Sequence, residues 1–479
     1  MNLTLLTDFY ELSMMQGYFL QREDPAVVFE MFFRRQPFGG GFSVFAGLES
    51  ALAHISALSF SAEDLAYLES LGSFRRDFLD FLSRFRFHGD VWAMDEGTLV
   101  FPGEPLVRVH GSLIEAQLVE SALLAILNFQ TLIATKTARI RLAANGGAIV
   151  EFGLRRAQGV DGALSASRAA FIGGALATSN TLAGKLYGIP VRGTMAHSWV
   201  MAFASEREAF EKYAEIYPDA TVLLIDTYDT LRSGIENAIA VGSKLRAAGH
   251  NGFGVRLDSG DLEYLSKKVR SRLDAAGLPD ARIMASNELD EHIVHQLITG
   301  GAPIDAWGVG THLVTGGGDP ALTGVYKICA RQDGSAWVPT IKVSNNPEKV
   351  TNPGIKQVWR FANAEGGPLA DLLCLDDDVP APGAAHIFHH PMGDYRSFSL
   401  RDYAASAPLL SLKMKDGKIL GDSPPVTALQ ARTIAELDRL DDTYKRLINP
   451  HVYRVSLSTR LRDLKARLIR ENFPGGAHE

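Results

Sequence analysis

The chain has 479 residues, of which 46% are hydrophobic and 22% are charged, and its formal net charge is −7. This length is too great for one compact core, and this composition is typical of a folded enzyme of two or three domains rather than of a disordered chain. The negative balance excludes a general nucleic-acid-binding protein, in which lysine and arginine would cluster.

Cysteine usage and the N-terminal residues indicate the compartment. The two cysteines, Cys329 and Cys374, show no pairing pattern, which favours a reducing environment. The first residues contain neither a basic stretch nor an apolar run of the kind that targets a chain or spans a membrane. We therefore expect a cytoplasmic protein that binds neither membranes nor nucleic acids.

The first part of the chain mixes short strands and helices, which predicts an N-terminal α/β domain over residues 1–112. Residues 3–6 are predicted to form a strand, and Thr7 and Asp8 then mark the start of a helix. The glycine run of residues 39–41 lacks the lysine and serine of a P-loop, so a flexible turn is the favoured interpretation.

A long helix is predicted over residues 113–143, because this segment is rich in Leu, Ala and Ile and is followed by Asn145-Gly146-Gly147. After this helix stop, short apolar strands alternate with helices. The predicted strands span residues 148–152, 190–194, 222–226, 254–257, 282–286 and 306–309. The predicted helices between them span residues 165–174, 178–187, 204–216, 229–248, 260–276 and 290–299.

This alternation predicts a parallel α/β architecture, and the number of units suits a (β/α) barrel better than an open sheet. We expect the barrel, with the active site, over residues 113–344 and a C-terminal module over residues 345–479 that packs back on the other two domains. Functional side chains of such folds gather where the strands end. The polar or glycine residues at these places are Arg155, His197, Asp226, Asp258, Asn287, Gly310 and Thr311.

The segment Arg256-Leu257-Asp258-Ser259 has the clearest chemical pattern. A strand presents Arg256 and Asp258 on one side, so the acid can accept hydrogen bonds from a sugar diol and the arginine can neutralise a phosphate. The alternative is a helix cap with a local ion pair. The strand end at Gly308 to Thr311 offers backbone N–H groups to a phosphate, although its glycines alone would also suit a tight turn. Together the two segments suggest a phosphorylated sugar.

His197 stands between the small residues Ala196 and Ser198 and is accessible enough to be an acid, a base or a nucleophile that accepts a phosphoryl group. The alternative is a hydrogen-bonded structural histidine. Arg155 and Arg156 suit an anion, or else form an ion-pair face with Glu151.

Two further clusters are given structural interpretations. The histidines of residues 386–390 lack acids or cysteines at ligand spacing, so a solvated loop is favoured over a zinc site. The acidic residues 376–378 are expected to form an exposed turn.

Five segments, in this order, resemble the nicotinate phosphoribosyltransferase family, and the resemblance extends from Thr7 to about Arg360. They are EFGLRRAQG (residues 151–159), ATSN (177–180), GTMAHS (193–198), RLDSGD (256–261) and GVGT (308–311). The resemblance implies the type II phosphoribosyltransferase fold, an irregular α/β barrel with an N-terminal α/β domain and a C-terminal extension.

The resemblance also implies transfer of 5-phosphoribosyl from phosphoribosyl pyrophosphate (PRPP) to nicotinate in NAD salvage, coupled to ATP hydrolysis through a phosphohistidine, with Mg²⁺. It implies a homodimer with shared active sites, in which Tyr10 enters the pyridine pocket of the partner. The residues that it assigns to catalysis are His197, as the phosphohistidine, and Asp258. Those that it assigns to substrate binding are Tyr10, Phe152, Arg155, Thr178, Ser179, Arg256, Ser259, Gly310 and Thr311.

Residue 179 bears on the choice between the acid and the amide. Where the related nicotinamide enzymes resemble Gly-Thr-Asp-Thr, this chain has Ala177-Thr178-Ser179-Asn180, so a hydroxyl donor replaces a carboxylate that would repel nicotinate. No P-loop sequence occurs, in agreement with ATP using the phosphate subsites of PRPP. Nicotinamide or quinolinate phosphoribosyl transfer, and a catalytically silent sugar-phosphate sensor, remain the alternatives.

Overall fold

The computed structural model describes residues 3–393 and 396–472. Their contacts divide the chain into two compact units. The terminal unit contains the described residues of 1–132, 321–424 and 431–479, and the central unit contains residues 133–320 and 425–430. Within the described residues, no helix has the length and apolar character that crossing a membrane would require.

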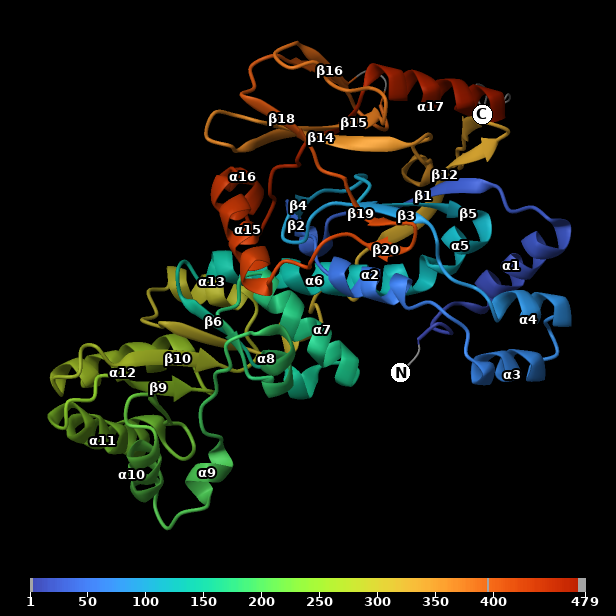
Figure 1. Ribbon diagram of the computed structural model, residues 1–479. Helices are drawn as coiled ribbons and strands as arrows, with labels where there is room; N and C mark the ends of the chain where they lie inside the picture. Colours follow the sequence, from blue (N-terminus) through green and yellow to red (C-terminus); the bar gives the residue numbers. More distant parts are fainter. Residues whose placement is uncertain (1–2, 394–395, 473–479) are drawn as a thin grey trace. The chain divides into compact units, whose positions relative to one another are not determined.

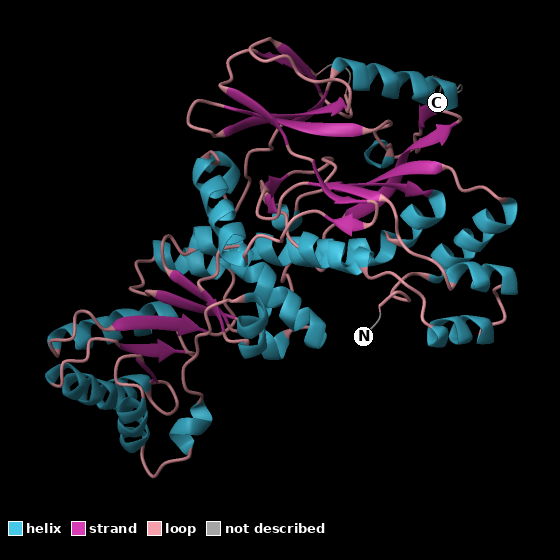
Figure 2. Ribbon diagram, viewed as in Figure 1, coloured by secondary structure: helices cyan, strands magenta, loops and turns pink. Residues whose placement is uncertain are grey.

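The terminal unit contains two large sheets and a two-stranded one (Figure 2). The first has the order β13 (Ala336–Pro339), β12 (Gly324–Asp333), β1 (Ala26–Phe33), β5 (Val107–Ser112), β3 (Asp90–Ala93), β19 (Ser411–Lys415), β20 (Lys418–Ile419). The second has the order β17 (Ser397–Leu400), β16 (His386–His389), β21 (Val455–Leu457), β15 (Pro368–Leu375), β14 (Lys356–Ala362), β18 (Ala405–Pro408). The smallest pairs β2 (Ser43–Val44) with β4 (Leu99–Val100).

The helices of the terminal unit, apart from the short one at Asp442–Lys445, bury apolar residues in one extensive core that includes β1 and β5. They are α1 (Phe9–Gln21), α2 (Leu48–Ser56), α3 (Ala62–Ser70), α4 (Arg76–Leu82), α5 (Leu113–Leu118), α16 (Asp442–Lys445) and α17 (Thr459–Asn472), with short 3₁₀ turns at Pro37–Gly39 and Pro347–Lys349. Two helices, α6 (Glu120–Ala143) and α15 (Val426–Arg439), contribute residues to both units.

The central unit is built on a parallel sheet of order β7-β6-β11-β10-β9-β8, which curls into a half-barrel (Figure 1). Its strands are β6 (Ala148–Glu151), β7 (Ala177–Thr178), β8 (Thr221–Leu224), β9 (Phe253–Leu257), β10 (Arg282–Ser286) and β11 (Ala306–Val309). Val255, Ile283 and Trp307 are fully buried, as expected for apolar strands covered on both faces. The predicted α/β class with an irregular barrel is thus confirmed.

The helices of the central unit follow the strands in alternation. They are α7 (Gly159–Ile172), α8 (Thr181–Tyr187), α9 (His197–Met201), α10 (Glu206–Ile216), α11 (Ile235–Ala247), α12 (Leu262–Ala275), α13 (Glu291–Thr299) and α14 (Thr311–Val314), with a 3₁₀ turn at Leu154–Arg156 and a π turn at Thr230–Gly234. Because β6, β9, β10 and β11 pair in parallel, their carboxyl ends all lie at the same edge of the sheet.

Several predicted elements differ from the structure. Residues 3–6 form a turn rather than a strand, since the Thr4 hydroxyl exchanges hydrogen bonds with the backbone of Ser59. The predicted helix 178–187 starts later, because the Asn180 side chain caps α8 and Thr178 belongs to β7. The predicted strand 190–194 is reduced to one bridge at Val191.

The contacts also group the predicted domains differently. Strand β1, from residues 1–112, pairs with β12, and β3 pairs with β19 from residues 345–479. One sheet is therefore shared by the two ends of the chain, and both ends fall in the same contact unit. Asp376 and Asp377 form an exposed turn, as expected, and the acidic residues 376–378 make ion pairs with Arg108 and Arg460.

Candidate active site

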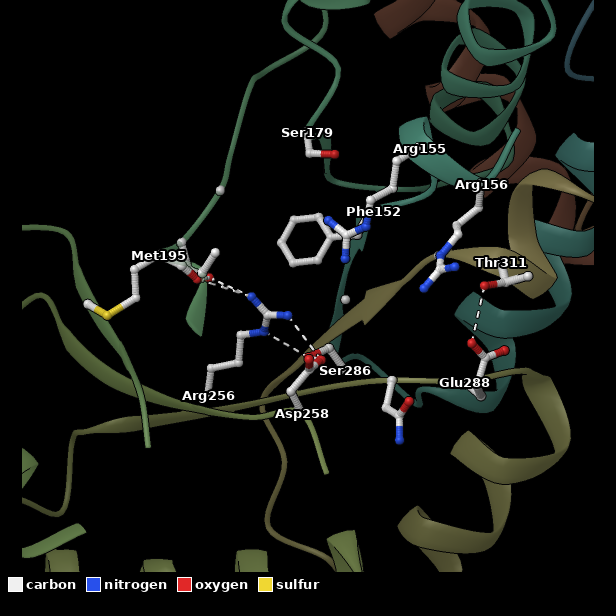
Figure 3. Close-up of a pocket in the computed structure, with 16 residues that line it drawn as sticks. Phe152, Arg155, Arg156, Ser179, Met195, Arg256, Asp258, Ser286, Glu288 and Thr311 are labelled. Carbon is white, nitrogen blue, oxygen red and sulfur yellow. Dashed lines mark hydrogen bonds and ion pairs between the residues drawn. The ribbon is translucent and has the colours of Figure 1, made fainter. Parts of the chain in front are cut away.

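A cavity of about 230 Å³ lies at the carboxyl ends of the parallel strands, within the central unit (Figure 3). Its lining comes from the ends of β6, β7, β9, β10 and β11 and from the loops that follow them. This is the edge at which parallel α/β folds place their ligands. The cavity therefore brings together segments that are far apart in the sequence.

Phe152 follows β6 and forms one wall of the cavity. A Cβ atom on Gly308 would come within 2.6 Å of its ring, so only glycine leaves the ring in this place. The guanidinium carbon of Arg256 lies 5.5 Å from the centroid of the same ring, at cation–π distance. Phe152 thus presents an aromatic surface next to a cation.

Arg155 and Arg156 lie on the 3₁₀ turn that follows Phe152, and both line the cavity. In Figure 3 the guanidinium of Arg155 lies beside Phe152, and that of Arg156 points toward the side of Thr311. The alternative of an ion-pair face with Glu151 is wrong, since that carboxylate is fully buried and accepts hydrogen bonds from neutral groups. The two arginines give this side of the cavity a positive potential.

Arg256 and Asp258 form the opposite side. Arg256 Nη2 lies 3.0 Å from Asp258 Oδ1, Arg256 Nε donates to the Ser286 hydroxyl at 2.8 Å, and Arg256 Nη1 donates to Thr194 Oγ1 at 2.9 Å. The Ser286 hydroxyl in turn donates a short hydrogen bond to Asp258. The guanidinium is therefore held by three groups before any ligand arrives.

Burial alone would raise the pKa of Asp258. The hydrogen bond from Ser286 and the charge of Arg256 outweigh it, with a smaller contribution from His197, and the pKa lies below its ordinary value. Asp261, rather than Asp258 or Ser259, caps helix α12. The ionised Asp258 is consequently not needed as a helix cap and is available as an acceptor.

His197 is the first residue of α9 and lies at the rim of the cavity, where its neighbour Ala196 is part of the lining. Its Nδ1 lies 3.1 Å from Thr227 Oγ1, and its Nε2 lies 3.7 Å from Asp258 Oδ2. The side chain is 43% exposed. One ring nitrogen is thus engaged by a hydroxyl, while the other faces an ionised carboxylate and solvent.

Gly310 and Thr311, for which the sequence predicts phosphate binding, line the cavity at the start of α14. The Thr311 hydroxyl donates to Glu288 Oε1 at 3.3 Å. Val314, on the same short helix, packs so closely on Gly153 that a Cβ atom there would overlap it. The turn after β6 and the turn after β11 are therefore fixed against each other.

Not every predicted site residue reaches the cavity. Thr178 is buried and donates to Glu151 at 2.5 Å, and the Ser259 hydroxyl donates to Asp226 at 2.6 Å. Tyr10 belongs to the terminal unit, where it is 47% exposed on α1. Phe152, Arg155, Ser179, Arg256, Asp258, Gly310 and Thr311 do line the cavity.

The sequence analysis gave no role to four of the lining residues, Thr194, Met195, Ser286 and Glu288. The sequence did indicate the position of Ser286, because it is the last residue of β10 and the bounds of this strand were predicted correctly. Asn287 adopts a φ of 103°. This backbone conformation is strained for any residue other than glycine, and such strained residues tend to occur at functional sites. The position of Asn287 after a strand end was the only sequence signal for it.

Within residues 3–393 and 396–472, no group of three or more His, Cys, Asp or Glu side chains is arranged to hold a metal ion. His386 and His389 lie on strand β16, so the expected loop is wrong. Two carboxylates, Asp258 and Glu288, line the cavity. Such a donor set fits a Mg²⁺ ion held mainly by substrate phosphates and water rather than by a protein cage.

Comparison with known proteins identifies the family. The chain matches the N-terminal domain of nicotinate phosphoribosyltransferase over residues 5–128, the nicotinate phosphoribosyltransferase family model over residues 148–315, and the C-terminal domain over residues 355–465. The nicotinate phosphoribosyltransferase of Bacillus subtilis is 43% identical, covering 98% of this chain and 97% of its own length. The human nicotinate phosphoribosyltransferase is 35% identical, covering 96% and 95%.

The fold leads to the same family. The crystal structure of human nicotinic acid phosphoribosyltransferase matches with a TM-score of 0.84 at 33% identity, covering 96% of this chain and 99% of that one. Family models, relatives of nearly full length and a solved structure agree. The chain therefore belongs to the nicotinate phosphoribosyltransferase family.

Proposed function

We propose that this protein transfers the 5-phosphoribosyl group of PRPP to the ring nitrogen of nicotinate, releasing pyrophosphate and nicotinate mononucleotide for NAD salvage. Family membership supports the proposal. One observation carries the proposal: in a single cavity, the ring of Phe152, with Arg155 beside it, faces the Arg256–Asp258 pair. An aromatic acid and a sugar phosphate need these two kinds of surface.

Nicotinate occupies the side of Phe152. Its ring stacks on the phenyl group, its carboxylate pairs with Arg155, and the hydroxyl of Ser179 donates a further hydrogen bond. The two carboxylates of the lining, Asp258 and Glu288, follow β9 and β10 and lie away from this side in Figure 3. The pyridine side is therefore free of acids that would repel nicotinate.

PRPP occupies the other side. Asp258 accepts hydrogen bonds from the ribose hydroxyls, Arg256 offsets phosphate charge, and the turn at Gly310 and Thr311 binds the 5′-phosphate. The nicotinate nitrogen attacks C1 of the ribose, the bond from C1 to the pyrophosphate oxygen breaks, and the electron pair leaves with pyrophosphate. Asp258 and Glu288 are the lining carboxylates that would hold Mg²⁺, and the ion would neutralise charge on the leaving group.

ATP is coupled through His197. The Nε2 nitrogen takes the γ-phosphoryl group, ADP leaves, and water later releases phosphate from the histidine. The Thr227 hydroxyl occupies Nδ1, which favours Nε2 as the nucleophile. In the test, γ-phosphate-labelled ATP labels the wild type, whereas His197→Ala stays unlabelled and loses the stimulation by ATP. A labelled variant would refute this assignment.

The active protein is a homodimer in which Tyr10 completes the pyridine pocket of the partner. Its exposure of 47% supports a role outside its own unit. Mixing Tyr10→Ala and Asp258→Asn, each expected to have little activity alone, by unfolding and refolding should restore about a quarter of the wild-type activity, since half of the random dimers carry one intact site of two. No restored activity would contradict shared sites.

The preference for nicotinate over nicotinamide tests the proposed transfer reaction. We expect product from nicotinate and little from nicotinamide or quinolinate. Ser179→Asp places a carboxylate beside the ring, so it should lower kcat/KM for nicotinate by about a hundredfold or more while sparing nicotinamide. Equal turnover of acid and amide by the wild type would contradict the proposal.

A further inference from the structure

Glu151 is a buried carboxylate that the proposed chemistry does not use. It is the last residue of β6 and has no exposed surface. Its Oε1 accepts a short hydrogen bond from the backbone N–H of Gly153, and its Oε2 accepts hydrogen bonds from Ser167 Oγ at 2.9 Å and Thr178 Oγ1 at 2.5 Å. Among the ion pairs of the described residues, none involves Glu151.

Burying a carboxylate without a cation nearby costs several kcal/mol of folding free energy. Hydrogen bonds must offset this cost, and such bonds also hold the donor groups in place. Both oxygens of Glu151 are occupied, and each donor lies on a different element: the turn after β6, helix α7 and strand β7. The carboxylate thus joins three segments at one point.

The network continues into the next helix. The Asn180 side chain donates to Ser167 Oγ at 3.2 Å, its N–H donates to Thr178 Oγ1 at 2.9 Å, and its Oδ1 accepts the N–H of Ala183 as the cap of α8. The Ser167 hydroxyl has a second acceptor in the backbone oxygen of Ala163 at 3.0 Å, whereas the shortest hydrogen bond of Thr178 Oγ1 is the one to Glu151. Thr178 donates to Glu151 and accepts from Asn180.

The groups held by this network are those that flank the pyridine side of the cavity. Gly153 lies between Phe152 and Arg155, and its N–H is bound by the Glu151 side chain. The backbone oxygen of Glu151 accepts the N–H of Ser179 at 2.9 Å. The Glu151 side chain therefore holds the peptide group between Phe152 and Gly153 and, through Thr178, the residue that precedes Ser179, whereas Arg256 and Asp258 are held by Ser286 and Thr194.

We propose that Glu151, together with Thr178, is a positioning residue for the aromatic acid, setting the place of Phe152, Arg155 and Ser179 without touching substrate. This inference rests on the proposed function, because it takes nicotinate as the ligand of that side. It assigns Thr178 to the support of the pocket rather than to substrate contact.

The test compares the KM values for nicotinate and for PRPP. Thr178→Val keeps the shape of the side chain and removes the donor, so it should raise the KM for nicotinate by about tenfold, the usual effect of leaving one buried polar group unpaired. The KM for PRPP should stay within about twofold of the wild type. Glu151→Gln, which places an amide where only acceptors fit, should have a larger effect of the same kind.

Two variants serve as controls. Thr178→Ser keeps the hydroxyl and should restore a KM for nicotinate close to that of the wild type. Ser165→Ala removes a hydroxyl from the same helix as Ser167 and should change neither KM, since no hydrogen bond of the Ser165 side chain occurs among those of the described residues. If Glu151→Gln does not fold, the comparison of Thr178→Val with Thr178→Ser still tests the positioning role.

Parallel increases of both KM values, or a lower Tm with an unchanged KM for nicotinate, would overturn the inference and leave a merely structural network. A Thr178→Ser variant as impaired as Thr178→Val would overturn it as well. These outcomes leave the proposed function intact, because the wild type still turns over nicotinate. A wild type that does not use nicotinate would remove the proposed function and this inference together.

Discussion

The guanidinium of Arg256 and the carboxylate of Asp258 are paired, with 3.0 Å between Nη2 and Oδ1, at the end of one strand. Ser286 binds both partners, so the pair is assembled before ligands arrive. His197 Nε2 lies 3.7 Å from the second oxygen of Asp258. The proposed sugar site and the proposed phosphohistidine therefore share a carboxylate.

Asp258→Asn should lower kcat/KM for PRPP by about a hundredfold or more. The variant keeps the shape of the side chain but loses the charge that orients Arg256 and faces His197. Steady-state kinetics with varied PRPP measure this. Asp274→Asn is the matched control, because that aspartate also pairs with an arginine, Arg270, but lies on the exposed face of α12. Near-normal activity of Asp258→Asn would argue against the ribose role.

The two arginines of the turn after Phe152 should have different effects. Arg155→Ala should raise the KM for nicotinate by about tenfold or more, as the loss of a charge-assisted hydrogen bond implies. Arg156→Ala should raise the KM for PRPP instead, because its guanidinium points toward the side of Thr311 in Figure 3. Arg232→Ala, at an arginine outside the cavity lining, is the control. If both variants raised the KM for the same substrate, the assignment of Arg155 to nicotinate and of Arg156 to PRPP would be contradicted.

Gly153→Ala should destabilise the protein by about 1–3 kcal/mol and impair activity, since the new Cβ atom overlaps the side chain of Val314. The double variant Gly153→Ala with Val314→Ala makes room and should recover part of the stability. Gly162→Ala, on helix α7 with no atom near the added carbon, is the control. Thermal unfolding gives the comparison. A tolerated single variant would show that the two turns can separate.

The stability of the terminal unit should depend on pH through Glu11. Burial, opposed by a hydrogen bond from Gln117, raises the pKa of Glu11 from 4.5 to about 7. The folded chain then holds a proton that the unfolded chain releases, so this contribution is full below pH 4.5 and is lost as the pH rises through about 7. The loss amounts to up to about 3 kcal/mol.

Denaturant unfolding between pH 4.5 and 8 measures this effect. Glu11→Gln should flatten the fall of stability in that window relative to the wild type, whereas Glu63→Gln, at an exposed position of α3, should leave the slope unchanged. An equal slope in wild type and Glu11→Gln would mean that the proton is not held at Glu11.

The sequence predicted the elements whose apolar pattern is strong. Strands β10 and β11 were predicted with the bounds that the structure shows, because each is a continuous apolar run between helices. Strand β7 has two residues and was missed, since so short a strand owes its pairing to β6 rather than to its own pattern. Tertiary context decided it.

In the candidate site too, residues with a local sequence pattern were predicted, and residues placed by tertiary contacts were missed. Arg256, Asp258 and Gly310 were predicted because each stands at a strand end. Ser286 and Thr194 became part of the site only through their hydrogen bonds to Arg256, which join segments more than twenty residues apart. Thr178 shows the reverse, because a residue inside a recognisable motif turned out to bond Glu151 instead of lining the cavity.

The measurement closest to the central claim is pyrophosphate release by the wild type with PRPP and nicotinate, with and without ATP. The account predicts release that requires nicotinate, rises with ATP and is matched by nicotinate mononucleotide. No release with nicotinate, or the same release with nicotinamide in its place, would contradict it.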